Sequence, residues 1–402
     1  MKITKYLTFI LILTTVMFLA NGFAEDSPKS IKVDGTVNDI KYSPDGTLLA
    51  VATSEGLWIY DIGGNAKPTA LIGHEGQVLA LAWSDSQTLA SGGDDKTVRL
   101  WDVRTAKMLK NFKGHKGRVN VLAFSPDGRM IASSSRYKEN FSKLYDKPMT
   151  SMPDDPINSP SDLHDLIEQV EQERKRWEEE DKREDRLRES FDNTIHLWNT
   201  NSVKHLKPLN ISGTALAFRN NKTLAIASND SRSNDSSILF QLYDVETGKS
   251  FSKINFSIGR ENIVKLDSSG IRTTSTTIST VVFSLDGTKF AMARVRVIAS
   301  DGSNRYQNII NNIINIVNGG TINIKDAKFP VATMAFSPNG SYLATGSADK
   351  TIQLIDIKKR KSIRTLNKHT DAVTALAFSK DGTLASGSKD GTVLIWKNLT
   401  SK

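Results

Sequence analysis

The sequence predicts an all-β fold that is built from several copies of one four-stranded unit. Two copies are nearly complete, GHEGQVLALAWSDSQTLASGGDDKTVRLWDV and KHTDAVTALAFSKDGTLASGSKDGTVLIWKN. His74 and Trp101 in the first copy are 27 positions apart, as are His369 and Trp396 in the second. Within each copy, short apolar and β-branched runs alternate with turn residues, which is typical of consecutive strands. A fixed period of this kind indicates a repeat fold.

The first strand of each copy is the easiest to follow along the chain. It is an apolar run that ends before a turn such as Ser-Pro-Asp-Gly. Copies four and five depart from the pattern, with Tyr243-Asp244 and Val317-Asn318 where Trp-Asp stands elsewhere. Seven copies are therefore expected, with six or eight as the alternatives. The expected first strands are residues 37–42, 78–83, 119–124, 214–218, 280–283, 332–336 and 373–378.

Several short motifs recur together in these copies: a Gly-His pair, an apolar strand, Leu-Ala-Ser-Gly, Asp-x-Thr-Val and Trp-Asp. In this combination, most of residues 30–400 resemble the WD-repeat β-propeller family. The resemblance implies a seven-bladed β-propeller in which each blade is a four-stranded sheet. The last copy supplies three strands, so residues 30–33 are expected to add the fourth. Such pairing would close the ring and remove exposed strand edges.

The resemblance also implies a hydrogen-bonded chain of His, Ser, Asp and Trp within a blade. A buried polar chain makes a blade rigid when every member is paired. A Ser-His-Asp set can instead form a catalytic triad, but a set that recurs in three blades indicates a structural role, so no catalytic residue is expected. The residues at the matching positions are His74, Ser91, Asp95 and Trp101; His115, Ser133, Asp192 and Trp198; and His369, Ser386, Asp390 and Trp396.

The third copy is interrupted by a block of 55 residues, 137–191. His115 and Trp198 are 83 positions apart, and removing the block and one turn residue restores the spacing of 27. One blade has therefore been opened at a single turn, which divides the propeller into residues 25–136 and 192–402. The first part of the block, residues 137–160, contains four prolines and is expected to be irregular.

The second part of the block, residues 161–189, is predicted to form a helix. Ser161 or Asp162 can cap it, and apolar residues then follow at spacings of three and four. Towards the end almost every residue is charged, at spacings that permit ion pairs. The helix is expected to pack on the propeller through its first turns; a partner-binding or coiled-coil helix and disorder are the alternatives. Its apolar stripe consists of Leu163, Leu166, Ile167, Val170 and Trp177.

Residues 1–24 are predicted to be an export signal. Lys2 and Lys5 precede an apolar run that is too short to span a bilayer core comfortably, since that core needs about 20 residues. Gly22-Phe23-Ala24 then provides small residues for cleavage, and an uncleaved anchor is the alternative. The chain contains no Cys, and a large propeller buries enough surface to do without disulfides. A bacterial protein exported to the periplasm or the exterior, with no membrane span after cleavage, is expected.

The charge and the missing motifs exclude several function classes. The formal net charge is +9 and the isoelectric point is near 9.4, which permits contact with acidic partners. The basic residues are scattered along the sequence, and no nucleic-acid-binding motif is present. A phosphate-binding glycine loop, a zinc helix motif and a nucleophile elbow are also missing. A monomer without cofactor, metal or nucleic acid is expected.

The enlarged turns indicate where function resides. Besides the block, residues 229–237, 257–277 and 297–312 are expected to be long polar loops, all on the top face of blades three to five. The leading hypothesis is a non-catalytic scaffold that binds a protein or peptide there. The rival is an exported propeller enzyme or a small-ligand-binding protein with a site at the mouth of the central channel. The partner-binding candidates are Gln77, Asp94, Arg118, Arg136, Leu166, Val170, Trp177 and Lys389.

Overall fold

The computed structural model describes residues 27–64, 66–135, 194–202, 213–229, 238–256, 265–267, 270–284, 289–300, 311–316, 320–324 and 329–399, and the single residues 206, 208, 209 and 211. The predicted signal, residues 1–24, and the predicted insertion with its helix, residues 137–191, lie outside these ranges. In the described ranges every helix or strand is a β-strand, which confirms the all-β class. None of these ranges holds a helix of the length and apolar character that a bilayer crossing requires.

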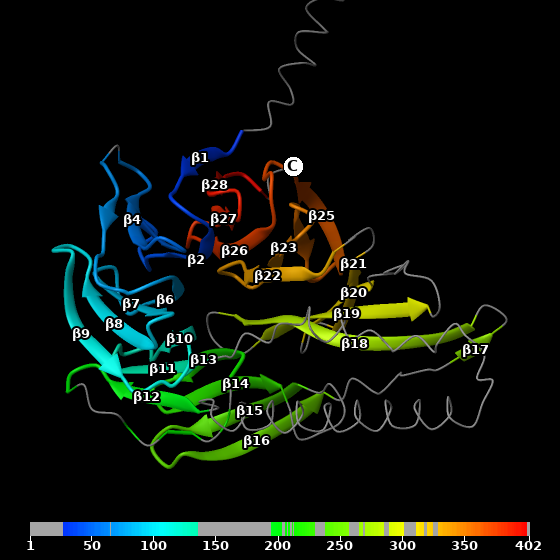
Figure 1. Ribbon diagram of the computed structural model, residues 1–402, viewed down its shortest axis with the longest axis horizontal. Coiled ribbons are helices and arrows are strands. Elements are labelled where there is room, and N and C mark those ends of the chain that lie inside the picture. Colours follow the sequence, from blue (N-terminus) through cyan, green and yellow to red (C-terminus); the bar gives the residue numbers. More distant parts are fainter. Residues whose placement is uncertain are drawn as a thin grey trace, which may run out of the picture.

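The described strands form seven antiparallel sheets (Figure 1). The four sheets made from consecutive sets of four strands are β2 (Val37–Tyr42), β3 (Leu48–Thr53), β4 (Leu57–Asp61) and β5 (Thr69–Ala70); β6 (Val78–Trp83), β7 (Thr88–Gly93), β8 (Thr97–Asp102) and β9 (Lys107–Lys113); β13 (Ala215–Asn220), β14 (Thr223–Asn229), β15 (Ile238–Asp244) and β16 (Lys249–Phe256); and β22 (Val331–Phe336), β23 (Tyr342–Ser347), β24 (Ile352–Asp356) and β25 (Lys361–Leu366).

The remaining three sheets depart from this plan in their strand number or chain order. They are β10 (Val119–Phe124), β11 (Met130–Ser135) and β12 (Ile195–Asn199); β17 (Lys265–Asp267), β18 (Gly270–Phe283), β19 (Phe290–Ser300), β20 (Asn311–Ile316) and β21 (Gly320–Ile324); and β26 (Val373–Phe378), β27 (Leu384–Ser388), β28 (Thr392–Trp396) and β1 (Lys29–Lys32).

Seven strands, one from each sheet, contact one another in a closed cycle. The order is β2, β6, β10, β13, β18, β22, β26 and back to β2. We call these the inner strands and number their sheets as blades one to seven. β2, β6, β10 and β26 have the predicted bounds, and β13 and β22 begin within one residue of them. A closed cycle of repeated antiparallel sheets is consistent with the expected β-propeller.

The N-terminal strand completes blade seven. β1 pairs with β28, so that Lys29 lies opposite Ile395 and Lys32 lies opposite Thr392. The pairing continues for one more bond, in which the Val33 N–H donates to the Gly391 carbonyl at 2.9 Å. Residues from both ends of the described chain therefore share one sheet, where the sequence placed the closing strand.

The core lies between neighbouring blades. Between blades seven and one, Val37, Ile40 and Leu49 pack with Ala385 and Val393 in one buried cluster. Comparable clusters fill the other junctions. Each fully buried large aliphatic side chain contributes about 1.5–3 kcal/mol, so blade-to-blade packing dominates the stability of the ring.

A close approach of glycine and valine recurs at three of these junctions. A Cβ added to Gly387 would lie 2.3 Å from Cγ1 of Val37 in the next blade. A Cβ on Gly92 would lie 2.6 Å from Val119, and one on Gly346 would lie 2.6 Å from Val373. Only glycine leaves room there for the first residue of the next inner strand.

Most inner strands also carry a β-bulge near their start. The register shifts between Val37 and Asp39 in blade one, and at the matching position of blades two, three, six and seven. The bulged residues tie blades together: Asn38 Nδ2 donates to the Val78 carbonyl at 2.9 Å, and Thr374 Oγ1 donates to the Val37 carbonyl at 2.5 Å. A bulge disrupts one ladder and re-aims a side chain, which here serves contact with the next blade.

Blade three has three strands in the described residues, whereas four were expected. The outer position is marked by a single bridge between Ile195 and Leu209. Pro208 stands beside this bridge and has no N–H to donate, so it prevents a regular ladder.

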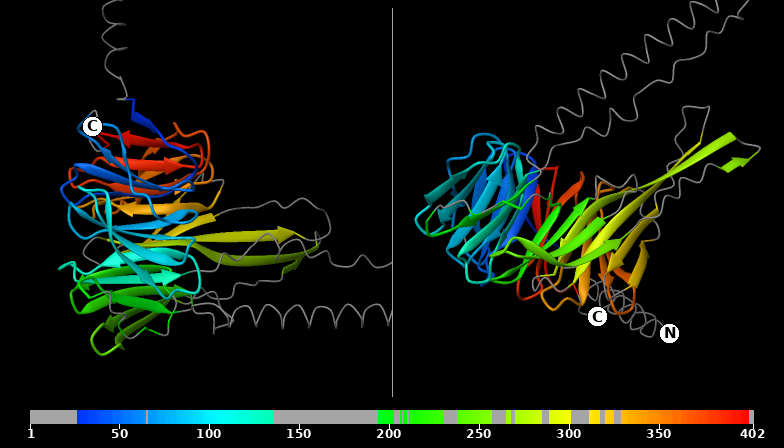
Figure 2. Two further views of the ribbon diagram at one scale, coloured as in Figure 1. Left: turned by 60° about the vertical axis from the view of Figure 1, so that its left-hand side comes forward. Right: turned by 90° about the horizontal axis from the view of Figure 1, so that it is seen from below.

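Blade five corrects a prediction about loops. Residues 257–277 and 297–312 were expected to be loops, but residues 265–267, 270–277, 297–300 and 311–312 form strands. β18 has 14 residues and β19 has 11, and Figure 2 shows this yellow and yellow-green pair reaching well beyond the other sheets. These segments are rich in Thr, Ile and Val, whose branched side chains suit a pleated strand.

Candidate functional site

The tetrad of blade two is a continuous chain of hydrogen bonds. Trp101 Nε1 donates to Ser91 Oγ at 2.7 Å, so the Ser91 proton is directed to His74 Nε2, also at 2.7 Å. His74 Nδ1 then donates to Asp95 Oδ2 at 2.8 Å. Burial alone would raise the pKa of Asp95, but the hydrogen bond from His74 holds that pKa well below its ordinary value. Asp95 is therefore a carboxylate that orients the imidazole.

Blade seven repeats this arrangement. Trp396 Nε1 donates to Ser386 Oγ at 2.9 Å, and His369 lies 2.8 Å from Ser386 and 3.0 Å from Asp390. Burial lowers the pKa of His369, although Asp390 acts in the opposite direction. Burial would raise the pKa of Asp390, but bonds from Thr392, Thr370 and His369 bring it to about 2. The buried pair is thus neutral imidazole and carboxylate.

Blade three carries the same bonds on either side of the insertion point. His115 Nε2 lies 2.7 Å from Ser133 Oγ, and Trp198 Nε1 donates to Ser133 Oγ at 2.7 Å. Asp192, the fourth predicted member, lies outside the described residues. His196 stands opposite Ser133 in the ladder, as Arg99 stands opposite Ser91 in blade two. The His115 and His196 rings are 4.1 Å apart.

The burial of the tetrads decides their chemistry. A triad nucleophile must reach its substrate, and the order Ser, His, Asp seen here is also the order of bonds in a catalytic triad. However, Ser91, Ser133 and Ser386 are 0% exposed, and each oxygen accepts an indole N–H. A hydroxyl enclosed in this way cannot attack a substrate, so the arrangement supports a structural role.

One face of the ring is closed by short turns. Each turn follows an inner strand, and we call this side the bottom face; the loops that lead into the inner strands lie on the opposite, top face. In the turn 43–46, Ser43 Oγ donates to Asp45 Oδ1 at 2.6 Å, a bond that lowers the pKa of Asp45 to about 2. Neighbouring turns are joined as well, since the Asp45 N–H donates to Ser86 Oγ at 3.2 Å. The Asp127 N–H donates to Asn221 in the same way, at 3.0 Å.

Four of the predicted partner-binding residues can be placed on the top face. Arg118 is exposed at the start of blade three, and its Nε lies 3.2 Å from Asp94 Oδ1 of blade two. Gln77 is half-buried and accepts a bond from Asn38 Nδ2 at 3.4 Å. Lys389 is exposed in the β27–β28 turn. The other four, Arg136, Leu166, Val170 and Trp177, lie outside the described residues.

Sequence reasoning missed Asn38, which contacts Gln77 and bonds the next blade. A signal existed, because Asn38 follows the first valine of its inner strand, the position where Asn120 and Thr374 stand in blades three and seven. In the described part of the chain, His, Cys, Asp and Glu do not gather in threes that could hold a metal ion.

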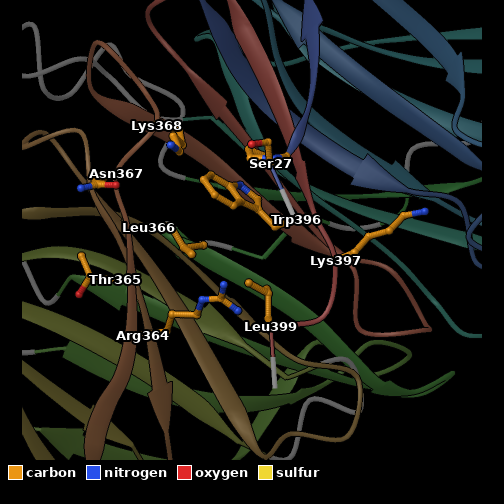
Figure 3. Close-up of a pocket in the computed structure, with 10 residues that line it drawn as sticks. Ser27, Arg364, Thr365, Leu366, Asn367, Lys368, Trp396, Lys397 and Leu399 are labelled. Carbon is orange, nitrogen blue, oxygen red and sulfur yellow. The ribbon is translucent and has the colours of Figure 1, made fainter. Parts of the chain in front are cut away.

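A shallow pocket opens on the outer rim between blades six and seven, away from the inner strands (Figure 3). Its buried floor includes Leu366, Trp396 and Leu399. The remaining lining residues are polar or basic and include no carboxylate: Ser27, Pro28, Arg364, Thr365, Asn367, Lys368 and Lys397. Lysines also stand on the outer strands β1, β9 and β25, where they protect exposed edges from pairing with other chains.

The repeated sheets and the recurring tetrads define a WD-repeat protein. Comparison with known families agrees: the WD domain, G-beta repeat family matches residues 66–102, 106–140, 322–356 and 360–397, which fall in blades two, three, six and seven. The chain belongs to the WD40 repeat family.

Its curated relatives share only short stretches with it. The B-type cell cycle switch protein ccs52A of Medicago truncatula is 38% identical over 115 residues, which are 28% of this chain and 23% of that protein. The anaphase-promoting complex subunit cdh1 of Dictyostelium discoideum is 34% identical over 27% of this chain and 14% of its own length. WD repeat-containing protein 1 of Gallus gallus is 40% identical over 19% and 13%. The chain thus matches less than a quarter of each of these relatives.

Proposed function

We propose that this protein is a non-catalytic scaffold, a seven-bladed propeller that binds a protein or peptide through its top face. The contacts would lie over blades three to five, where the insertion 137–191 and the long strands of blade five belong. The asymmetry of the two faces carries this proposal. Bottom-face turns bond one another from blade to blade, whereas the top face presents Arg118, Lys389 and the extended β18–β19 pair.

Two further observations support a binding role. The buried tetrads and the bonds between blades make a rigid frame, and recognition commonly uses variable loops on a rigid frame. The printed names of two relatives place them in assemblies, one as an anaphase-promoting complex subunit and one as a U3 snoRNP-associated protein-like protein. These assemblies belong to the relatives, and they favour a protein partner for this chain only as a class.

The rival hypothesis, an enzyme or small-ligand binder at the channel mouth, requires converging carboxylates or imidazoles there. The described residues expected at that rim are Gln77, Asp94, Arg118, Ala348, Ala372 and Lys389, which are mixed in charge. Such a mixture offers neither an acid–base pair nor a metal site, so it favours binding over catalysis.

The proposed setting is outside the cytoplasm. The charged start, the short apolar run and Gly22-Phe23-Ala24 support export with cleavage after Ala24, to the periplasm or the exterior. We further propose that the mature protein is a monomer without a membrane span, cofactor or nucleic-acid partner.

Hydrogen exchange on the complex with a partner captured from the native envelope fraction tests the binding face. Protection is expected in residues 137–191, 229–237 or 257–277, with unchanged exchange in the bottom turns 43–46, 337–340 and 379–382. Protection confined to those turns would contradict the proposal. Protection around the channel mouth with a small molecule alone would favour the rival.

A matched pair of variants sharpens this test. Arg118→Ala removes a top-face cation and should weaken binding about fivefold, the upper end for one partly exposed ion pair. Lys380→Ala removes an exposed cation from a bottom turn and should leave affinity unchanged. If Lys380→Ala weakens binding and Arg118→Ala does not, the assignment of the face is wrong.

A further inference from the structure

The bulge of blade five marks where the ring ends and an added structure begins. Its register shifts between Ile278 and Thr280, at the position where the other bulged inner strands have only one residue left before their start. β18 instead continues for nine residues, 270–278, and β19 continues to residue 300. Because inner strands end at the bottom face, this extension leaves the top face. We call residues 270–278 and 294–300 the ribbon.

The ribbon is regular over a considerable length. Seven consecutive pairs join its strands, from Arg272 opposite Ser300 to Ile278 opposite Arg294. At about 3.3 Å per residue, these pairs extend roughly 20 Å. Both views of Figure 2 show it standing clear of the other blades.

Register gives the two faces of the ribbon different compositions. Residues directly opposite each other share a face, and alternate residues along a strand share a face. Arg272, Arg294 and Arg296 therefore occupy one face, to which β17 adds Lys265 opposite Arg272 and Asp267 opposite Gly270. The other face holds uncharged residues: Thr273, Ser275, Thr277, Val295, Val297 and Ala299.

One edge of the ribbon is available for pairing. β17 pairs with β18 only at residues 270–272, and no other described strand pairs with that edge of β18 from 273 to 277. An unpaired strand edge is a template for an extended segment of another chain. Two strands alone are marginally stable in water, and a third strand stabilises them.

We propose that the edge of β18 at residues 273–277 accepts an extended segment of a partner protein in which acidic residues alternate with β-branched apolar residues. Added as a strand, such a segment aligns its carboxylates with the arginine face and its apolar residues with the Thr and Val face. Charge complementarity supports the acidic partner, since residues 270–284 and 289–300 contain no Asp or Glu. The inference rests on the proposed function and specifies the chemistry of the partner.

A synthetic peptide of four Glu-Val pairs, labelled with a fluorophore, is the probe, and the full chain is the receptor. Its anisotropy should rise on binding, and the affinity should fall as salt is raised. Four Lys-Val pairs should not bind. A peptide of four Glu followed by four Val, which has the same composition, should also fail because its residues do not alternate between faces. Equal binding of the alternating and blocked peptides, or no binding of either, would overturn the proposal.

Charge reversal locates the site. Arg272→Glu combined with Arg294→Glu and Arg296→Glu should weaken the Glu-Val peptide about tenfold, the combined contribution of three partly exposed ion pairs, and should confer binding of the Lys-Val peptide. Lys107→Glu combined with Lys113→Glu and Lys361→Glu makes the same charge change on the outer strands β9 and β25 and should do neither. Thermal melts of both variants within a few degrees of the parent establish that each is folded.

Three outcomes separate this inference from its alternatives. If the ribbon variant keeps full affinity for the peptide, the arginines serve only to prevent edge pairing, and the proposal fails. If sedimentation shows that the parent is a dimer that the ribbon variant abolishes, the occupant is a second copy, and the proposal also fails. If the captured native partner still binds the ribbon variant but not Arg118→Ala, the proposed function stands and the ribbon proposal alone is overturned.

Discussion

Trp198 donates its indole N–H to the hydroxyl of Ser133 at 2.7 Å, although 65 residues separate them in the chain. The equivalent pairs Trp101–Ser91 and Trp396–Ser386 are separated by only 10 residues. The same bond therefore forms across the insertion as within an uninterrupted blade. The ladder agrees, because β11 pairs with β12 from Met130–Asn199 to Ser134–Ile195 as β7 pairs with β8. Blade three accommodates the added chain without losing its register.

The tetrads are expected to stabilise the ring. Trp101 is fully buried, and Trp101→Ala should lower the free energy of unfolding by about 3–5 kcal/mol, as the loss of a buried large aromatic does. Trp177→Ala, in the predicted insertion, should cost less than about 1 kcal/mol. Urea unfolding measures both. Equal losses would contradict the division into a repeat scaffold and an added block.

Acid should destabilise the ring through His369. Burial lowers the pKa of this side chain, so the unfolded chain binds more protons below the ordinary His value of about 6.5. The free energy of unfolding should therefore fall as the pH drops below about 6.5. Asp390, whose pKa is lowered to about 2, adds a further loss only below the ordinary Asp value of 3.8.

His369→Gln isolates this contribution. The variant should lose less stability than the parent between pH 7.5 and pH 5, as measured by urea unfolding. His164→Gln, in the predicted insertion, should leave the pH dependence of the parent unchanged. An identical pH dependence in parent and His369→Gln would show that the buried imidazole is not the group responsible.

Ring closure should depend on the approach of Gly387 to Val37. Gly387→Ala places a methyl 2.3 Å from Val37 Cγ1 and should destabilise by about 1–3 kcal/mol, the range for overpacking. Val37→Ala alone also destabilises, because it leaves a cavity. Together the two changes should cost less than the sum, by about 0.5 kcal/mol or more, since the second makes room for the first. A double-mutant cycle tests this, and simple additivity would argue against tight contact across the closure.

The inner strands and the tetrad positions could be predicted because each depends on a short local pattern. Val37–Tyr42 reads as a strand that ends at a Ser-Pro-Asp-Gly turn, and the register of such a unit follows from its turns. The ribbon was missed because residues 270–277 lie outside the repeat period and their Thr and Ser were interpreted as loop residues. Contacts such as Asn38 to Val78 depend on how two blades meet, which no local pattern contains.

Export predicts a defined mature N-terminus. Protein recovered from a bacterial host that exports it should begin at Glu25, because Gly22-Phe23-Ala24 precedes the expected cleavage point. N-terminal sequencing of the periplasmic or secreted fraction gives the answer. An intact Met1 form in the membrane fraction would instead establish an uncleaved anchor.

The central claim is that the repeats form a complete ring without the block between Arg136 and Asp192. Thermal unfolding of a chain in which these two residues are joined tests it most directly. The repeat period closes across this junction, and loop insertions cost little free energy. The shortened chain should therefore be soluble and unfold in one cooperative transition within a few degrees of the parent. Insolubility or a far lower midpoint would show that the block is part of the core.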